Sequence, residues 1–186
     1  MELTRQEAID IARERVGNEN LVKHMIAVGA AMRALAPRFG GDPDRWELAG
    51  ILHDIDYNET KDNFEKHGHL SYEWLRQMGV DEDIAAAVRA HPAHPGFEPK
   101  NPMQWALHIV DPLTGLIVAA ALMHPSRKLA GVDTKFVLRR FKEKRFAAGA
   151  NREQIKLCEP KLGIPLEEFV SIVLGAMQSV AEELGL

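Results

Sequence analysis

Apolar residues recur along most of the chain at intervals of three and four, which is the spacing of one face of an α-helix. The clearest example is a single stripe that begins after Asn20 and consists of Leu21, Met25, Val28, Met32 and Leu35. No segment shows the alternation of apolar and polar residues that is typical of a half-buried strand. The pattern therefore predicts an all-α protein, folded as a helical bundle.

Capping signals divide this pattern into separate helices. Thr4 and Glu7 have the spacing of a capping box, which opens a first helix that ends near Gly17. The pairs Asp42-Pro43 and Asn101-Pro102 place a cap before a proline, as at many helix starts. Further helices are predicted from 43 toward 53, from 67 to 78, from 82 to 91, from 102 to 123, from 133 to 144, from 151 to 159 and from 165 to 183. Pro112 predicts a kink within its helix.

The length of the chain fits one domain with a substantial buried core. Its 186 residues contain no low-complexity linker and no obvious internal repeat. We therefore predict a single domain over residues 1–186. Its core lies at about 20–123, and helices over 133–184 pack on that core.

Composition and charge narrow the class of protein. The formal charge of −4 gives no general attraction to nucleic acid or to an anionic membrane. The longest apolar run, Gly115 to Met123, has nine residues, whereas a membrane span needs roughly 20. The first ten residues lack the features of a secretory signal. The single cysteine, Cys158, excludes a disulfide framework and a thiolate cluster. These features predict a cytoplasmic protein with no membrane partner.

Histidines are concentrated in one part of the chain. Five of the eight fall within 42 residues, namely His53, His67, His69, His91 and His94. His24 lies beside the apolar stripe of its helix, and Asp111 interrupts an apolar helix, where a buried carboxylate is costly unless it is paired or binds a cation. Taken singly, each of these residues fits a hydrogen-bonded core histidine or a helix cap. Taken together, they favour a metal site, because bundles build such sites from facing helices.

The order of these residues resembles the HD superfamily of metal-dependent phosphohydrolases, in particular its small bacterial members. His24 is followed by His53-Asp54 within AGILHDIDY and by Asp111 within ALHIVDPLTGL. The stretches KHGHLSYEWLRQMG and DEDIAAAVRAHP are similar to the insert of HD proteins that hold two metals. The resemblance covers about residues 20–123, and it implies an HD-domain bundle with the metal site in its core.

The resemblance also implies individual roles. The ligands of a first metal are His24, His53, Asp54 and Asp111, and Asp54 bridges to a second metal that His67 and His91 hold. His94 completes the second site or contacts the substrate. His69 lies outside it, since side chains two residues apart on a helix point about 200° apart. His108 hydrogen-bonds a ligand, and His124 is a loop residue.

The residues that follow the His-Asp pair depart from the family pattern, in which Gly-Lys or an acidic residue often assists the chemistry. Here the sequence is Ile55-Asp56-Tyr57. We predict that Asp56 acts as general acid or water-orienting base, alongside Asp54 and His94 in catalysis, and that Tyr57 contacts a phosphate oxygen. The cation that would hold the phosphate is left open among the following residues: Arg76, Arg89, Lys128, Lys135 and Arg145.

Imidazole and carboxylate ligands without thiolate suit one or two divalent transition-metal ions, namely Mn, Fe, Co, Ni or Zn, better than Mg. Two such ions provide hydroxide that attacks a phosphomonoester or phosphodiester, with a nucleotide as the expected small phosphorylated substrate. Two alternatives remain: a mixed-valent di-iron oxygenase of the same fold, and a non-catalytic metal-containing module that binds a ligand. The chain is expected to be a monomer or a homodimer.

Overall fold

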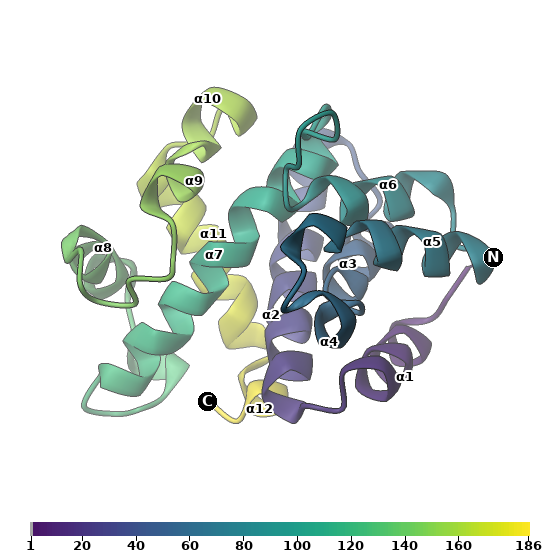
Figure 1. Ribbon diagram of the computed structural model, residues 1–186. Coiled ribbons are helices and arrows are strands. Elements are labelled where there is room, and N and C mark those ends of the chain that lie inside the picture. Colours follow the sequence, from purple (N-terminus) through teal and green to yellow (C-terminus); the bar gives the residue numbers. More distant parts are fainter. Residues whose placement is uncertain (1) are drawn as a thin grey trace.

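The computed structural model describes residues 2–186, which fold into packed helices (Figure 1). In chain order these are α1 Arg5–Val16, α2 Glu19–Leu35, η1 Ala36–Phe39, α3 Pro43–Leu52, α4 Tyr57–Thr60, η2 Phe64–Lys66, α5 His69–Gln77, α6 Glu82–Ala90, α7 Pro102–Met123, η3 Leu129–Gly131, α8 Thr134–Lys142, α9 Arg152–Lys156, α10 Cys158–Leu162, α11 Leu166–Ser179 and α12 Ala181–Leu184. No strand occurs in residues 2–186, so the predicted all-α class is confirmed.

The predicted helix starts depend on the caps that the sequence shows. The Thr4 hydroxyl accepts a hydrogen bond from the Glu7 amide, and the Glu7 carboxylate accepts one from the Thr4 amide, which completes the capping box. The Asn101 side chain likewise accepts from the amide of Gln104 at the start of α7. These side chains satisfy amides that the helices themselves leave unpaired.

Helix α5 begins two residues later than predicted. Gly68 has a φ of 85°, a left-handed conformation that glycine adopts readily, and the helix starts only at His69. His67 therefore lies ahead of the helix, in extended backbone after η2. The two helices predicted over 151–159 and 165–183 are each divided, into α9 with α10 and into α11 with α12.

Two glycines bring α2 and α3 into backbone contact. A Cβ atom added to Gly50 of α3 would lie 2.5 Å from the Cα of Gly29 of α2, closer than any real side chain permits. This approach draws together the chain segments that carry two of the predicted ligands. The ring centroids of His24 and His53 are 5.2 Å apart.

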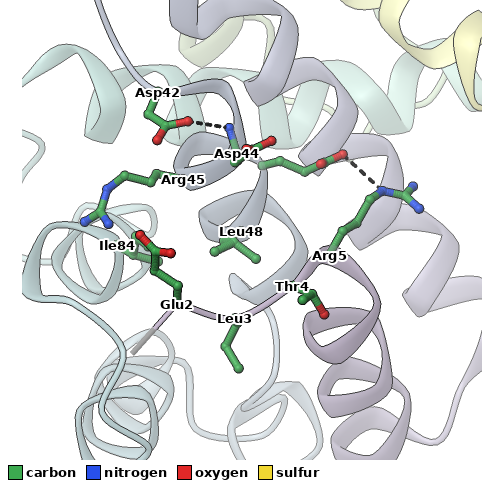
Figure 2. Close-up of a pocket in the computed structure, with 10 residues that line it drawn as sticks. Glu2, Leu3, Thr4, Arg5, Asp42, Asp44, Arg45, Leu48 and Ile84 are labelled. Atoms are coloured by element: carbon green, nitrogen blue, oxygen red, sulfur yellow. Dashed lines mark hydrogen bonds and ion pairs between the residues drawn. The ribbon is translucent and has the colours of Figure 1, made fainter.

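The N-terminal segment is tied to the bundle by ion pairs around a small cavity of about 290 Å³ (Figure 2). Arg5 Nε lies 3.2 Å from a carboxylate oxygen of Glu47 in α3. Arg45, which also lines the cavity, pairs at 2.8 Å with Asp81. The two arginines of this cavity are therefore already paired with carboxylates, and none of its described lining residues is a histidine.

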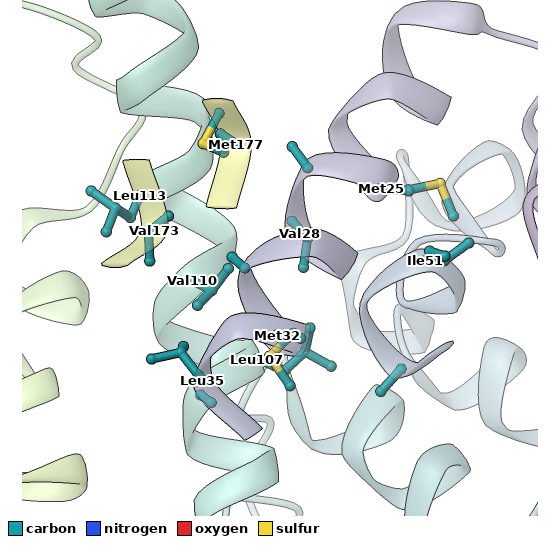
Figure 3. Close-up of a cluster of buried hydrophobic side chains, with 14 of the residues drawn as sticks. Met25, Val28, Met32, Leu35, Ile51, Leu107, Val110, Leu113, Val173 and Met177 are labelled. Carbon is teal, nitrogen blue, oxygen red and sulfur yellow. The ribbon is translucent and has the colours of Figure 1, made fainter. Parts of the chain in front are cut away.

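Helix α2 lies at the centre of the core and packs against α3, α7 and α11. Four residues of its predicted stripe, Met25, Val28, Met32 and Leu35, are fully buried. Figure 3 shows Met32 beside Leu107 of α7. After residue 133, α8 and α11 pack on α7, and α11 and α12 pack on α2. The core thus surrounds the helix that carries His24.

Helix α7 continues through Pro112 from Pro102 to Met123. Proline has no amide hydrogen, so the carbonyl of His108 loses its helical donor. That carbonyl instead accepts a hydrogen bond of 2.6 Å from the side-chain amide of Gln154 in α9. By length and composition α7 is the one helix of residues 2–186 that resembles a membrane span, but 61% of its most apolar window is buried inside the protein, as in a core helix.

Candidate metal centre

Six predicted ligands come together from separate parts of the bundle. They form two groups that share Asp54, and the ligand atoms within each group lie within 4.8 Å of one another. The first group is His24, Asp111, His53 and Asp54; the second is Asp54, His67 and His91. Helices α2 and α7 carry His24 and Asp111, whereas the other four residues lie just beyond the ends of α3, η2 and α6.

Asp54 lies between the two groups and directs one carboxylate oxygen to each. Its Oδ2 is 3.6 Å from His24 Nε2 and 3.2 Å from His53 Nε2. Its Oδ1 is 3.3 Å from His67 Nε2 and 3.5 Å from His91 Nε2. A carboxylate placed in this way is suited to bridge two cations.

The first group is the more open one. His24 Nε2 lies 2.9 Å from Asp111 Oδ1, and the side chains of these two residues are 25% and 29% exposed. His53 is fully buried, with its Nε2 3.5 Å from the same Asp111 oxygen. In the second group the side chain of His91 is 2% exposed and that of His67 14%. Access from solvent is therefore at His24 and Asp111.

All four histidines present Nε2 to the cluster because Nδ1 is engaged elsewhere. The Nδ1–H groups of His53 and His91 donate to the carbonyls of Gly50, at 2.6 Å, and Val88, at 2.5 Å, which are the carbonyls of their own preceding helix turns. His24 Nδ1 lies 3.4 Å from the hydroxyl of Thr114. A carbonyl only accepts, so in His53 and His91 it is Nδ1 that carries the hydrogen, and Nε2 can offer a lone pair to a cation.

These Nε2 atoms lie close to one another and to carboxylate oxygens. The Nε2 atoms of His67 and His91 are 3.1 Å apart. The buried Nε2 of His53 has no hydrogen-bond partner in residues 2–186. Such a set of acceptors, each held by a second hydrogen bond, fits a bound divalent cation of the type that imidazole and carboxylate prefer.

The electrostatics of the cluster favour a cation. Burial opposes ionisation, but the charge of His53 and the close approach of the imidazole nitrogens hold the pKa of Asp54 well below its usual range, and the nearby rings of His24 and His53 lower the pKa of Asp111. Burial likewise opposes charging of His67, yet Asp54 and Asp56 raise its pKa to about 9. Both carboxylates are thus ionised at neutral pH, and His67 carries a proton that offsets part of their charge.

Asp56 is held by hydrogen bonds from the segment before α5 and the start of that helix, and its predicted catalytic role stays a prediction. Asp56 is fully buried, and its carboxylate accepts from His67 Nδ1 at 2.7 Å, Gly68 N at 2.7 Å and Ser71 N at 3.0 Å. Its geometry orients His67 toward Asp54.

The other histidines lie around the cluster rather than in it. His94 Nε2 donates to the carbonyl of His67 at 2.8 Å, and the ring of His69 stacks on His94 at 5.2 Å. His108 Nδ1 donates to the backbone carbonyl of His91, a predicted ligand, at 2.6 Å. His124 follows the end of α7, outside the helix as predicted.

Two arginines predicted as phosphate contacts are engaged elsewhere. Arg76 donates to the carbonyl of Val80 at 2.7 Å and pairs with Glu82 at 3.2 Å. The Arg89 guanidinium lies over the rings of Tyr72, at 3.8 Å, and Phe97, at 4.9 Å. The roles of Tyr57, Lys128, Lys135 and Arg145 stay predictions.

Sequence reasoning missed Thr114, although it lies three residues after Asp111 and therefore on the same side of α7. Its hydroxyl donates to the carbonyl of Asp111 at 2.9 Å, so its oxygen is free to accept from His24. A buried threonine one turn from a predicted ligand is a signal that the sequence does contain.

Comparison with known proteins identifies the domain that carries most of these residues. An HD domain matches residues 21–110, which include all the clustered residues except Asp111, the residue that follows. An uncharacterized protein of Methanocaldococcus jannaschii is 31% identical over 147 residues, covering 75% of this chain and 83% of that protein.

Two ribonucleases Y are similar over shorter parts of their length. That of Oleidesulfovibrio alaskensis is 28% identical over 98 residues, which are 53% of this chain and 18% of the enzyme. That of Thermotoga maritima is 26% identical over 145 residues, which are 76% of this chain and 28% of the enzyme. The chain thus spans less than a third of either ribonuclease. From the matched domain, the Methanocaldococcus relative and the clustered His-Asp residues together, we conclude that this chain belongs to the HD domain family, whose members are typically metal-dependent hydrolases.

Proposed function

We propose that the protein is a metal-dependent phosphohydrolase that cleaves a phosphomonoester or a phosphodiester. The observation that carries this proposal is the position of Asp54, which offers one oxygen to each of two adjacent ligand groups. Two cations held by a shared carboxylate are a common arrangement in phosphatases and nucleases.

The chain supplies both the ligands and their orientation. We assign His24, His53, Asp54 and Asp111 to one cation, and Asp54, His67 and His91 to the other. Bound divalent cations would lower the pKa of water and offset the charge of phosphoryl oxygens. The nitrogen and oxygen donors favour Mn, Fe, Co, Ni or Zn.

His94 is the side chain that we propose to contact the substrate. Its Nε2 is held by the carbonyl of His67, which leaves Nδ1 available for a proton or a hydrogen bond. The ring is half-buried and lies beside the exposed Phe64, with their centroids 5.0 Å apart. His94 therefore lies at the edge of the second group, beside His67.

Nucleotides are a substrate class that the screen must include. Two of the relatives are ribonucleases by name, and RNA is itself a phosphodiester. The metals supply the positive charge for the phosphate, because the arginines nearest the cluster in the sequence already have partners.

The test combines metal analysis with a screen of phosphoesters. Purified protein is expected to contain up to two transition-metal ions per chain and to hydrolyse at least one phosphoester with Mn, Co or Ni. Asp54→Asn is expected to lose this activity, whereas Asp62→Asn, an exposed aspartate outside both groups, retains it. Metal without hydrolysis would contradict the proposal; oxygen uptake by iron-loaded protein would then identify an oxygenase, and its absence a binding module.

A further inference from the structure

A groove of about 470 Å³ is lined by residues of α2 and α7 and by residues 184–186. His24, a ligand of the first group, is part of its wall. Since His24 and Asp111 are the most exposed side chains of the cluster, the groove adjoins the side from which a substrate reaches it. Its volume is in the range of small-molecule sites.

One wall of the groove is a stripe of α7 that starts at the metal centre. Gly115, Val118 and Leu122 follow Asp111 at intervals of four, three and four, and so lie on the same face of the helix. The side chain of Leu122 is 46% exposed. This stripe is apolar although it is not buried in the core, and it lines the groove.

The end of the groove is also apolar and is held in place. Leu184 and Leu186 line it, and the carbonyl of Leu186 accepts a hydrogen bond of 3.1 Å from the amide of Leu129. On the α2 side, Asn20 and Lys23 add an amide and an ammonium group. Away from the ligand His24, these are the only polar side chains among the described lining residues.

We propose that this groove binds the organic group that the substrate carries on its phosphoryl group, and that this group is apolar. The proposal rests on the proposed function, which places the phosphoryl group at the cluster. A nucleoside would need partners for its sugar hydroxyls and base edges, and the groove offers two polar side chains. An alkyl or aryl group needs no hydrogen-bond partners, and its transfer from water to the groove is favourable in free energy. The substrate class is therefore a small alkyl or aryl phosphoester.

Two glycines provide a matched pair of variants for the test. Gly115 and Gly175 both lie inside helices, and a Cβ atom added at either would meet no atom of residues 2–186 within 4 Å beyond its own helix turn. Gly115→Phe places a ring in the groove, whereas Gly175→Phe places one on α11, outside it. Both probes are substrate-like but resist hydrolysis: methylphosphonate and benzylphosphonate share the phosphonate and differ in the organic group.

The experiment is calorimetric titration of the manganese-loaded protein. The original protein and Gly175→Phe are expected to bind benzylphosphonate about tenfold more tightly than methylphosphonate, and Gly115→Phe to lose most of this preference. Should Gly115→Phe misfold, Leu122→Ala is expected to reduce the ratio of the two affinities, benzylphosphonate over methylphosphonate, about threefold. Its control, Met123→Ala, changes an exposed residue that does not line the groove.

An unchanged ratio in Gly115→Phe or in Leu122→Ala would overturn the groove assignment. Tighter binding of adenosine monophosphate than of benzylphosphonate, lost in Gly115→Phe, would overturn the apolar class in favour of a nucleotide. The ratio is measured without turnover, so it separates the two proposals. A protein that shows the ratio but hydrolyses no phosphoester refutes the proposed function alone, and one that hydrolyses without the ratio refutes the groove alone.

Discussion

The two ligand groups around Asp54 are built in different ways. In the first group, His24 and Asp111 come from the interior of long helices, and their positions depend on how α2 and α7 pack. In the second, His67 and His91 lie just beyond helix ends and are held by local hydrogen bonds to Asp56 and to the carbonyl of Val88. The first group is open to the groove and the second is enclosed. This comparison predicts that the two cations can be removed separately, except through the residue that they share.

The largest effect is expected for Asp54→Ala, because this change removes a ligand from both groups. Elemental analysis after dialysis should find less than one metal ion per chain in the variant, against the two that we expect in the original protein. Asp62→Ala serves as the control. Circular dichroism checks that the helices persist. Two tightly bound ions in Asp54→Ala would show that the groups do not share this carboxylate.

Replacing His67 and His91 together with alanine should remove one metal ion and leave the other. The first group keeps its full set of four ligands in this variant, since none of them comes from η2 or α6. Elemental analysis is expected to fall from two ions to one. If both ions were lost, or if the original protein held a single ion that this change did not affect, the two-metal arrangement would be wrong.

Asp56→Asn should weaken the second site without abolishing it. The amide retains the size of the carboxylate but loses the charge that holds Nδ1–H of His67 at 2.7 Å. Changes in such orienting partners typically cost 10–100-fold in metal affinity. Competition with a chelator would measure the affinity of each ion. An equal loss of affinity at both sites would contradict the inference that, among the proposed metal ligands, Asp56 orients only His67.

Thr114→Val should have the smallest effect, confined to the first site. The contact from its hydroxyl to His24 Nδ1 is long, at 3.4 Å, and valine keeps the shape of the side chain. We expect the affinity of the first ion to fall by less than about tenfold, at the low end for an orienting partner. The same chelator titration reports it. A larger loss at the second site would show that the groups are coupled through more than Asp54.

Much of the site was predictable from individual residues. A carboxylate inside an apolar helix at Asp111 and a histidine beside an apolar stripe at His24 are unusual enough to indicate a role, and the His53-Asp54 pair connects them through the family resemblance. The structure brings these residues together with His67 and His91. Helix starts were predictable for a similar reason, since a cap and its amide are only three residues apart.

The role of Asp56 was not predictable in this way. Its partners Gly68 and Ser71 lie 12 and 15 residues away and reach it only because Gly68 turns the chain before α5. Spacing alone leaves an aspartate near a catalytic pair free to be an acid or a base. The structure adds the hydrogen bonds and the burial of Asp56, and its catalytic role stays a prediction.

By itself, the sequence determined the helical class and the capped helix starts, because periodicity and capping act over a few residues, and it supplied the imidazole and carboxylate types of the proposed ligands. The tertiary structure decided that Asp54 directs one carboxylate oxygen to each group of residues and that the group with His24 and Asp111 is the one exposed to solvent. It also decided that α7 forms a groove with α2 and residues 184–186. These features depend on contacts between segments far apart in the chain. Such contacts are set by close packing, as where Gly29 meets Gly50, and packing is a property of the whole fold.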